Sequence, residues 1–291
     1  RCSPFTGGSR RRGMIQDIGE HTFDNQYHPC PPDRESYALY YEDHAALVRK
    51  YPDRIEFPKF RDIERLNEDI YEDAVYLFSI DGERYYLVEE INRERQSHFT
   101  MENTEIFRYA EPQYLAFAGI TGYQLHNWYQ SRRFCGKCGR RMKKDSKERM
   151  LYCESCHNME FPKICPAVII GVTDGDKILM SKYAGRTYKK YALLAGFTEI
   201  GETLEETVQR EVMEEVGLKV KNIRYYKSQP WSFTDTLLMG FYCDLDGEAA
   251  ITLDREELAM AEWFQRDEIP VEPERDSITN EMIIRFKNGE V

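Results

Sequence analysis

Three glutamates are spaced so that a helix would gather their carboxylates on one face, where they could hold a metal ion. Residues 196–218 read GFTEIGETLEETVQREVMEEVGL. On a helix, Glu211 lies one turn from both Glu214 and Glu215, because residues three or four apart share a face. Arg210 precedes Glu214 by four residues and could brace that carboxylate. Magnesium takes oxygen ligands and keeps several waters for phosphate chemistry. The stretch therefore predicts a magnesium-pyrophosphate site.

The alternative for this stretch is a solvated acidic face, which is what most charge runs on helices are. Arg210 among the carboxylates and the glycine-bearing loop 196–201 before the helix weigh against that alternative. We expect the helix over 203–216, since no proline or glycine interrupts it and Gly217 stands where a C-cap glycine belongs. A valine stripe at i, i+4 and i+8 is suited to burial, and consists of Val208, Val212 and Val216.

A second group that could hold a metal consists of four of the eight cysteines. Cys135-Gly-Lys-Cys138 is followed after fourteen residues by Cys153-Glu-Ser-Cys156. This spacing resembles a zinc ribbon, in which four thiolates close a tetrahedral site. A closed site has no open position for substrate, so we expect structural zinc. A pair of redox dithiols or a chance spacing is the alternative.

The segment around these cysteines is locally basic. Its cations are Arg132, Arg133, Lys137, Arg140, Arg141, Lys143, Lys144, Lys147 and Arg149. A basic strip can track phosphates. A solvated surface or a dimer contact explains the same charges equally well, and both interpretations stay open.

Composition limits the class of protein. The chain has 291 residues, enough for more than one domain, and a net charge of −11, which argues against broad adhesion to nucleic acid or anionic membrane. The longest aliphatic run, 167–172, is too short to span a bilayer. Clustered cysteines without an export signal favour a reducing, cytoplasmic compartment. We expect residues 1–13 to be a leader or extension and no membrane partner.

The order of expected hairpins and helices indicates how the chain is divided into domains. We expect an N-terminal α+β domain over 14–130, a zinc ribbon over 131–162 and a further domain over 163–291. Asp81-Gly82 and Asp174-Gly175-Asp176 mark the turns of two hairpins, over 73–88 and 167–182. The run AVIIGV at 167–172 indicates a sheet covered on both faces. Other expected elements are helices over 111–130 and 278–287 and strands over 223–228, 236–244 and 261–264.

The acidic stretch resembles the Nudix box of the Nudix hydrolases. That box is glycine, five residues, glutamate, seven residues, then Arg-Glu-aliphatic-x-Glu-Glu-x-Gly-aliphatic. Residues 196–218 fill every fixed position at the right spacing. The resemblance implies hydrolysis of a nucleoside diphosphate linked to another group, with Mg²⁺ or Mn²⁺. It also implies the α/β/α sandwich with a mixed sheet of the Nudix fold, here within an α+β chain.

A motif after the box narrows the resemblance. A zinc ribbon before the box and the sequence SQPWSFTDT at 228–236 are together similar to the NADH pyrophosphatase subfamily, whose members also remove NAD caps from RNA. That subfamily carries SQPWPFPxS. Here Ser232 and Thr234 replace two prolines, and Thr236 replaces the last serine. The replaced prolines imply a less rigid loop.

The resemblance assigns roles by position. It places divalent-metal ligands at Glu211, Glu214, Glu215 and Glu257, with Glu215 also as the base and Arg210 as the residue that orients the glutamates. It places zinc on Cys135, Cys138, Cys153 and Cys156. It places substrate contacts at Glu148, Phe161, Ala195, Phe197, Gln229, Pro230, Trp231, Ser232, Phe233 and Thr236, where Phe161 and Phe197 could stack on a nicotinamide or adenine ring.

The function implied is metal-dependent hydrolysis of NADH or NAD⁺ to nicotinamide mononucleotide and AMP, and removal of NAD caps from RNA, by a homodimer. One alternative keeps the Nudix chemistry and changes the substrate to ADP-ribose, a diadenosine polyphosphate or another dinucleotide. A second alternative is a zinc-ribbon RNA-binding regulator whose Nudix domain only senses a ligand. The intact metal glutamates argue against that regulator.

Overall fold

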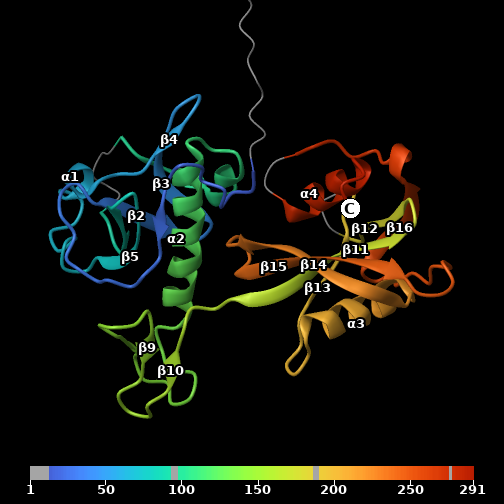
Figure 1. The fold of residues 1–291 in the computed structure, drawn as a ribbon. Coiled ribbons are helices and arrows are strands. Elements are labelled where there is room, and N and C mark those ends of the chain that lie inside the picture. The colour runs from blue at the N-terminus through green and yellow to red at the C-terminus, as the bar shows by residue number, and fades with distance from the viewer. Residues whose placement is uncertain (1–12, 93–97, 186–189, 275–276) are drawn as a thin grey trace, which may run out of the picture. The chain divides into compact units, whose positions relative to one another are not determined.

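The computed structural model describes residues 13–92, 98–185, 190–274 and 277–291 (Figure 1). The chain packs as two compact units. One comprises Pro166–Gln229, Leu238–Val291 and the described residues up to Asp17, and the other comprises Ile18–Cys165 with Pro230–Leu237. The leader expected at residues 1–13 lies outside the described residues apart from Gly13. The expected domain boundaries at 130 and 162 remain proposals.

The first unit is built on a sheet with strand order β14-β15-β11-β12-β16, with β13 also paired to β11. The strands are β11 (Cys165–Asp174), β12 (Lys177–Tyr183), β13 (Leu194–Phe197), β14 (Val220–Trp231), β15 (Thr236–Leu245) and β16 (Leu258–Gln265). The helices are α3 (Leu204–Val216), η2 (Arg266–Glu268) and α4 (Ile278–Lys287). The hairpin and both helices predicted here are confirmed.

Strand β11 carries side chains for both faces of this sheet. Val168, Ile170 and Val172 pack in one apolar cluster with the valine stripe of α3. Ile169, between them, packs in a second cluster with residues of α4 such as Met282. Successive residues of a strand point to opposite faces, so an unbroken apolar run is what a sheet between two helices requires. Figure 1 shows α3 and α4 on opposite faces, which is the predicted α/β/α sandwich.

The second unit has a mixed sheet with order β1-β5-β6-β2-β3-β4, to which β7 adds through β3. Its strands are β1 (Phe23–Asp24), β2 (Tyr37–Glu42), β3 (Ala45–Lys50), β4 (Ile55–Glu56), β5 (Val75–Ile80), β6 (Glu83–Val88) and β7 (Thr100–Asn103). The helices are α1 (Phe60–Ile63), η1 (Thr104–Arg108) and α2 (Gln113–Ser131). The predicted hairpin turns at Asp81 and Gly82, both at positive φ.

Helix α2 contains two glycines that the sequence did not explain. A Cβ at Gly119 would lie 2.5 Å from the ring of Phe107 in η1, and one at Gly122 would lie 2.5 Å from Leu39. The hydroxyl of Tyr41 also donates to the carbonyl of Gly119 at 2.6 Å. The glycines therefore let η1 and β2 approach the helix closely, which offsets their low helix propensity.

The zinc-ribbon segment has short strands in the order β10-β9-β8, namely β8 (Lys143–Lys144), β9 (Leu151–Tyr152) and β10 (Met159–Glu160). It is attached to the rest of its unit by Arg149, which donates to Asn25 Oδ1 at 2.7 Å and to the carbonyl of Leu77. Arg149 is therefore not part of an open basic strip. Among the described helices, none combines the length and apolar character needed to cross a membrane.

Candidate active site and zinc site

Helix α3 is fixed at both ends by its own sequence. The hydroxyl of Thr203 accepts from the N–H of Glu206 at 3.2 Å, and the Glu206 carboxylate accepts from the N–H of Thr203 at 2.8 Å. This capping box satisfies N–H groups that a helix start leaves without partners. Gly217 ends the helix in the left-handed region at φ 70°. The valine stripe is fully buried, so the rotation of the helix and the direction of its glutamates are fixed.

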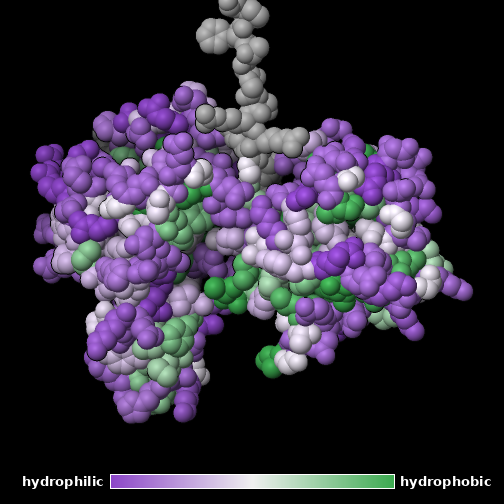
Figure 2. Space-filling model, in the orientation of Figure 1, coloured by the Kyte–Doolittle hydropathy of each residue, from purple (hydrophilic) through white to green (hydrophobic). Residues whose placement is uncertain are grey.

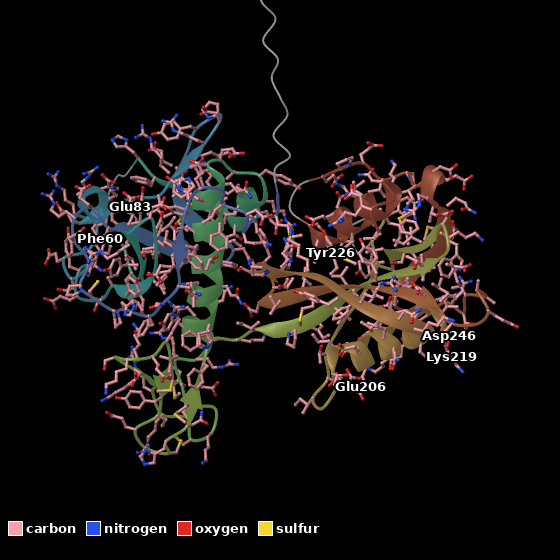
Figure 3. All side chains as sticks on the ribbon, in the orientation of Figure 1. Phe60, Glu83, Glu206, Lys219, Tyr226 and Asp246 are labelled. Carbon is pink, nitrogen blue, oxygen red and sulfur yellow. The ribbon has the colours of Figure 1, made fainter. Side chains whose placement is uncertain are left out.

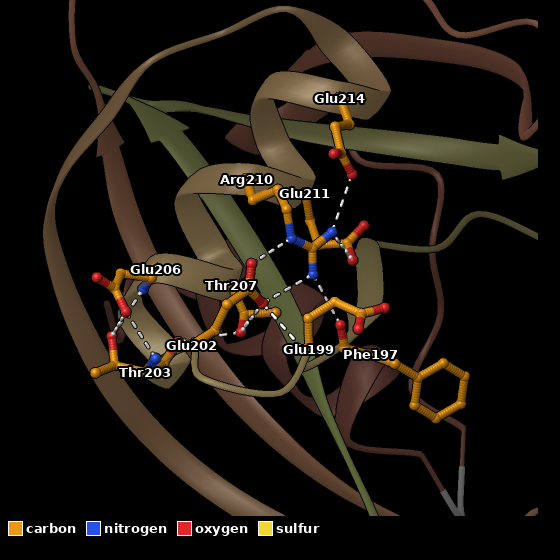
Figure 4. A network of polar contacts seen from close by, with 9 residues as sticks. All are labelled: Phe197, Glu199, Glu202, Thr203, Glu206, Thr207, Arg210, Glu211 and Glu214. Carbon is orange, nitrogen blue, oxygen red and sulfur yellow. Dashed lines mark hydrogen bonds and ion pairs between the residues drawn. The ribbon is translucent and has the colours of Figure 1, made fainter.

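Arg210 is the centre of the polar network in Figure 4. Its Nη1 donates to Glu211 at 2.7 Å and to Glu214 at 2.9 Å, which confirms the expected i, i+4 contact. Its other donors hold Glu202, at 2.5 Å from Nε and 3.0 Å from Nη2. Nη2 also reaches the carbonyl of Phe197 at 2.9 Å. One guanidinium thus joins the loop before α3 to two carboxylates on the helix.

Glu202 belongs to this network, although its role was not predicted from the sequence. Its position in the Nudix box was the available signal, but the pairing across eight residues needs the turn at Gly201, where φ is 95°. Hydrogen bonds from Arg210 lower the pKa of Glu202 to about 2. Glu202 is therefore ionised throughout the physiological range.

Gly196 makes room for a carboxylate. A Cβ placed on Gly196 would lie 1.9 Å from Cδ of Glu211 and 2.0 Å from its Oε1. Strand β13 holds Gly196 opposite Val168 of β11, so the backbone there cannot easily move away. The carboxylate of Glu211 lies directly against this backbone, a contact that only glycine permits.

Negative charge is crowded at the end of α3. Glu211 is 8% exposed and Glu215 is 2% exposed. Burial raises the pKa of Glu211 above its ordinary value, Arg210 opposes this, and the charges of Glu214 and Glu257 add to the rise. The segment leading to Glu257 is tied to the helix, because the N–H of Asp254 donates to the carbonyl of Glu215 at 2.9 Å. The carboxylates of Glu211, Glu214 and Glu257 repel one another here, and carboxylates are the oxygen ligands that a hard divalent cation prefers.

These glutamates are arranged differently from the cysteines. In the described parts of the chain, four cysteine side chains lie close enough together to bind one ion. They are Cys135, Cys138, Cys153 and Cys156. Glu211 and Glu214 are instead held by Arg210. The chemistry of the carboxylates fits a divalent cation, and Arg210 positions two of them.

We expect Glu202→Gln to lower stability in a pH-dependent way. Because the folded-state pKa of Glu202 is lowered from 4.5 to about 2, its contribution to stability is fully present above pH 4.5 and is lost as the pH falls toward 2. Thermal melts should show a lower Tm for the variant at pH 7 and converging Tm values between pH 4.5 and 2. A Tm difference that stays constant over this range would contradict the Arg210–Glu202 pairing.

The four cysteine sulfurs fit a zinc ion. They lie within 4.8 Å of one another, with Cys135 and Cys156 3.5 Å apart and Cys138 and Cys153 3.4 Å apart. Tetrahedral zinc with bonds of about 2.3 Å places sulfurs about 3.8 Å apart. A hydrogen bond from the backbone of Cys156 is the main cause that lowers the pKa of Cys153. Figure 3 shows sulfur atoms gathered in the ribbon.

The hairpin tip, residues 230–236 where β14 turns into β15, holds five of the ten predicted substrate residues. The Trp231 and Phe233 rings lie 5.1 Å apart, and the guanidinium of Arg108 lies over both. Ser232 and Thr236 are buried, and the Thr236 hydroxyl donates to the carbonyl of Thr234 at 3.0 Å. Arg108 could not be predicted from the sequence, because nothing in the local sequence around it indicates a partner more than a hundred residues away.

The other predicted substrate residues have varied surroundings. Gln229 is fully buried, and its side-chain oxygen accepts from the N–H of Ile278 at 2.9 Å, so it holds the start of α4. Phe197 is 56% exposed and Phe161 is 53% exposed. The catalytic candidates lie in one unit, together with Ala195, Phe197 and Gln229. Glu148, Phe161 and the segment from Pro230 to Thr236 lie in the other unit. Their roles in binding substrate stay predictions.

Comparison with known families agrees with this geometry. The pattern of the NUDIX domain matches residues 163–286, and that of the NADH pyrophosphatase zinc ribbon domain matches residues 130–161. The chain carries a Nudix domain and this zinc ribbon. The predicted Nudix fold and the predicted zinc ribbon are thereby confirmed. The four-cysteine cluster is the zinc site of the ribbon.

Curated proteins that are similar to part of this chain carry a more specific name. The NAD-capped RNA hydrolase NudC of Photorhabdus laumondii is 41% identical over 56% of this chain and 63% of its own length, and that of Enterobacter sp. (strain 638) is 41% identical over 56% and 62%. The chain thus matches less than two thirds of these relatives. A NUDIX hydrolase from Nitrosomonas europaea is 24% identical, with a TM-score of 0.47, over 54% of this chain and 90% of that chain.

Proposed function

We propose that this Nudix protein hydrolyses the pyrophosphate bond of NADH or NAD⁺ to nicotinamide mononucleotide and AMP, and removes NAD caps from RNA. The observation that carries the proposal is the Arg210 network. Arg210 donates hydrogen bonds to Glu211 and Glu214 and so fixes the positions of their carboxylates, on the same helix that carries Glu215. The ribbon pattern and the relatives named NAD-capped RNA hydrolase favour this substrate over other dinucleotides. The products from capped RNA would be the mononucleotide and an RNA with a 5′-monophosphate.

The chain's own residues would act as follows. Glu211, Glu214, Glu215 and Glu257 would hold Mg²⁺ or Mn²⁺, which when bound supplies charge neutralisation and a more acidic water. Glu215 accepts the proton of the water that attacks one phosphorus in line, and the other phosphate leaves. Arg210 keeps the carboxylates of Glu211 and Glu214 in place.

Substrate selection would come from aromatic rings. Phe197, exposed on β13, presents a ring on which a nicotinamide or adenine could stack, and Phe161 presents another. The hairpin tip with Trp231 and Phe233 would contact the dinucleotide. We propose that the protein works as a homodimer in the cytoplasm, where reduced thiols keep the ribbon cysteines available for zinc.

Replacing Glu215 by Gln is expected to lower kcat for NADH at least about 100-fold, because the residue that takes the proton is lost. The measurement is incubation with NADH and Mn²⁺, with and without EDTA, and identification of AMP and reduced nicotinamide mononucleotide by mass spectrometry. Glu205→Gln, at an exposed position of the same helix, is the matched control and should keep full activity. Turnover retained by a folded Glu215→Gln protein would remove Glu215 from the mechanism.

A further inference from the structure

An arginine from the N-terminal part of the chain lies on the two rings of the hairpin tip. The guanidinium carbon of Arg108 is 4.7 Å from the ring centre of Trp231 and 4.6 Å from that of Phe233. The rings are tilted at 48° to each other. A guanidinium within about 6 Å of an aromatic face is attracted by the ring quadrupole, most strongly for tryptophan. One cation therefore holds both aromatic residues of the tip.

Arg108 is itself held by its own helical turn. Its Nε donates to Glu105 Oε2 at 2.6 Å. The N–H of Glu105 donates to the side chain of Asn103, the N-cap of η1. Phe107, the neighbour of Arg108, is 1% exposed and lies against Gly119 of α2. The arginine thus projects from a rigid support, so ordering it for the contact loses less conformational entropy.

The tip is fixed at its far end as well. The N–H of Cys165 donates to the carbonyl of Asp235 at 2.7 Å, and Lys163 Nζ lies 3.5 Å from the Asp235 carboxylate. Ser232 and Thr234, on either side of Phe233, lack the fixed φ of proline. Without another restraint, the part of the tip that carries the two rings would sample more conformations.

We propose that Arg108 is a positioning residue that fixes Trp231 and Phe233 in the arrangement that binds substrate. The N-terminal part of the chain thereby contributes to affinity for the dinucleotide without touching the reacting phosphates. This inference rests on the proposed function of the tip. It predicts that loss of the cation raises KM and leaves the chemical step unchanged, because the carboxylates around Arg210 are not involved.

The test compares Arg108→Met, Arg108→Lys and Arg54→Met. Arg108→Met keeps an apolar stem and removes the charge. Arg108→Lys keeps a cation that can still interact with the rings, and is expected to rescue part of the effect. Arg54→Met is the matched control, because Arg54 lies 4.2 Å from the ring centre of Tyr51 in the same unit and has no contact with the tip. Steady-state kinetics with NADH and acrylamide quenching of Trp231 fluorescence are measured for each. The fluorescence of Trp231 alone is obtained by subtracting the fluorescence of the same protein carrying Trp231→Phe from that of each protein.

For Arg108→Met we expect KM to rise about tenfold, which corresponds to about 1.4 kcal/mol, with kcat within about twofold of wild type. Quenching of Trp231 should increase, since the guanidinium no longer covers its ring. The KM and the Trp231 quenching of Arg108→Lys should lie between those of wild type and those of Arg108→Met. Both quantities should be the same in Arg54→Met as in wild type. Unchanged KM and quenching in folded Arg108→Met would overturn the proposal, as would an equal effect of Arg54→Met. If wild type does not cleave NADH, the proposed function fails, while the quenching still decides whether Arg108 holds the rings.

Discussion

Replacing Gly196 by Ala is expected to reduce kcat/KM for NADH at least about 100-fold while the protein stays folded. The new methyl group would lie 1.9 Å from Cδ of Glu211, so the carboxylate must leave its place. A displacement of about 1 Å of a group in the reaction site can reduce the rate about 100-fold. Steady-state kinetics with NADH and Mn²⁺ measure the effect, and circular dichroism checks the fold. Gly136→Ala is the matched control, because a Cβ there meets nothing within 4 Å.

A double-mutant cycle tells whether Glu211 transmits this effect. If Gly196→Ala acts by displacing the carboxylate, then adding it to Glu211→Gln should reduce activity little further, because the two changes remove the same interaction. Losses that multiply in the double mutant would mean that Gly196 acts through another contact. Gly196→Ala with wild-type activity would show that strand β13 moves aside, and would contradict the close fit described here.

Replacing Cys153 by Ser is expected to remove zinc and unfold the ribbon. Four thiolates contribute to binding, and apparent zinc-binding free energies in small zinc-finger peptides are about 10–16 kcal/mol. The ribbon has only short strands and few buried apolar side chains with which to compensate. Zinc content, measured by elemental analysis, should fall from about one ion per chain to near zero. A melting transition at lower temperature should then appear beside that of the remaining chain.

Cys165→Ser controls for the loss of a thiol outside the cluster, since Cys165 is only half-buried and lies at the start of β11. It should keep both zinc and melting temperature. Full zinc content in Cys153→Ser would contradict the four-cysteine site.

Four exposed apolar residues also belong to this region, namely Phe134, Met159, Phe161 and Ile164. Figure 2 shows a hydrophobic area on the ribbon among hydrophilic side chains. Increased binding of a hydrophobic dye to Cys153→Ser would report further exposure.

Local patterns in the sequence predicted ten of the twenty-two described elements, among them the helices α2, α3 and α4, but not the strands β1 to β4. Helix α4 has the predicted bounds, and α3 begins one residue later, because Thr203 is its N-cap. The first hairpin turns at the predicted pair Asp81-Gly82, where both residues have a positive φ. The second turns at Gly175 and Asp176, because Asp174 still pairs with Lys177. The unbroken apolar run of β11 predicted a sheet covered on both faces, and the valine stripe of α3 predicted the buried face of that helix. Such signals depend on neighbours within one turn or one strand, which the sequence shows directly.

The sequence by itself therefore determined the Nudix box and the zinc ribbon, and it predicts which residues would hold the metals. Only the tertiary structure decided which of them meet. Arg108 reaches Trp231 and Phe233 through η1 packing on α2, and Arg149 leaves the basic strip to bond Asn25 and Leu77. Gln229, within the predicted binding motif, holds α4. Contacts between residues far apart in sequence depend on how packed elements bring side chains together, and no local pattern records that geometry.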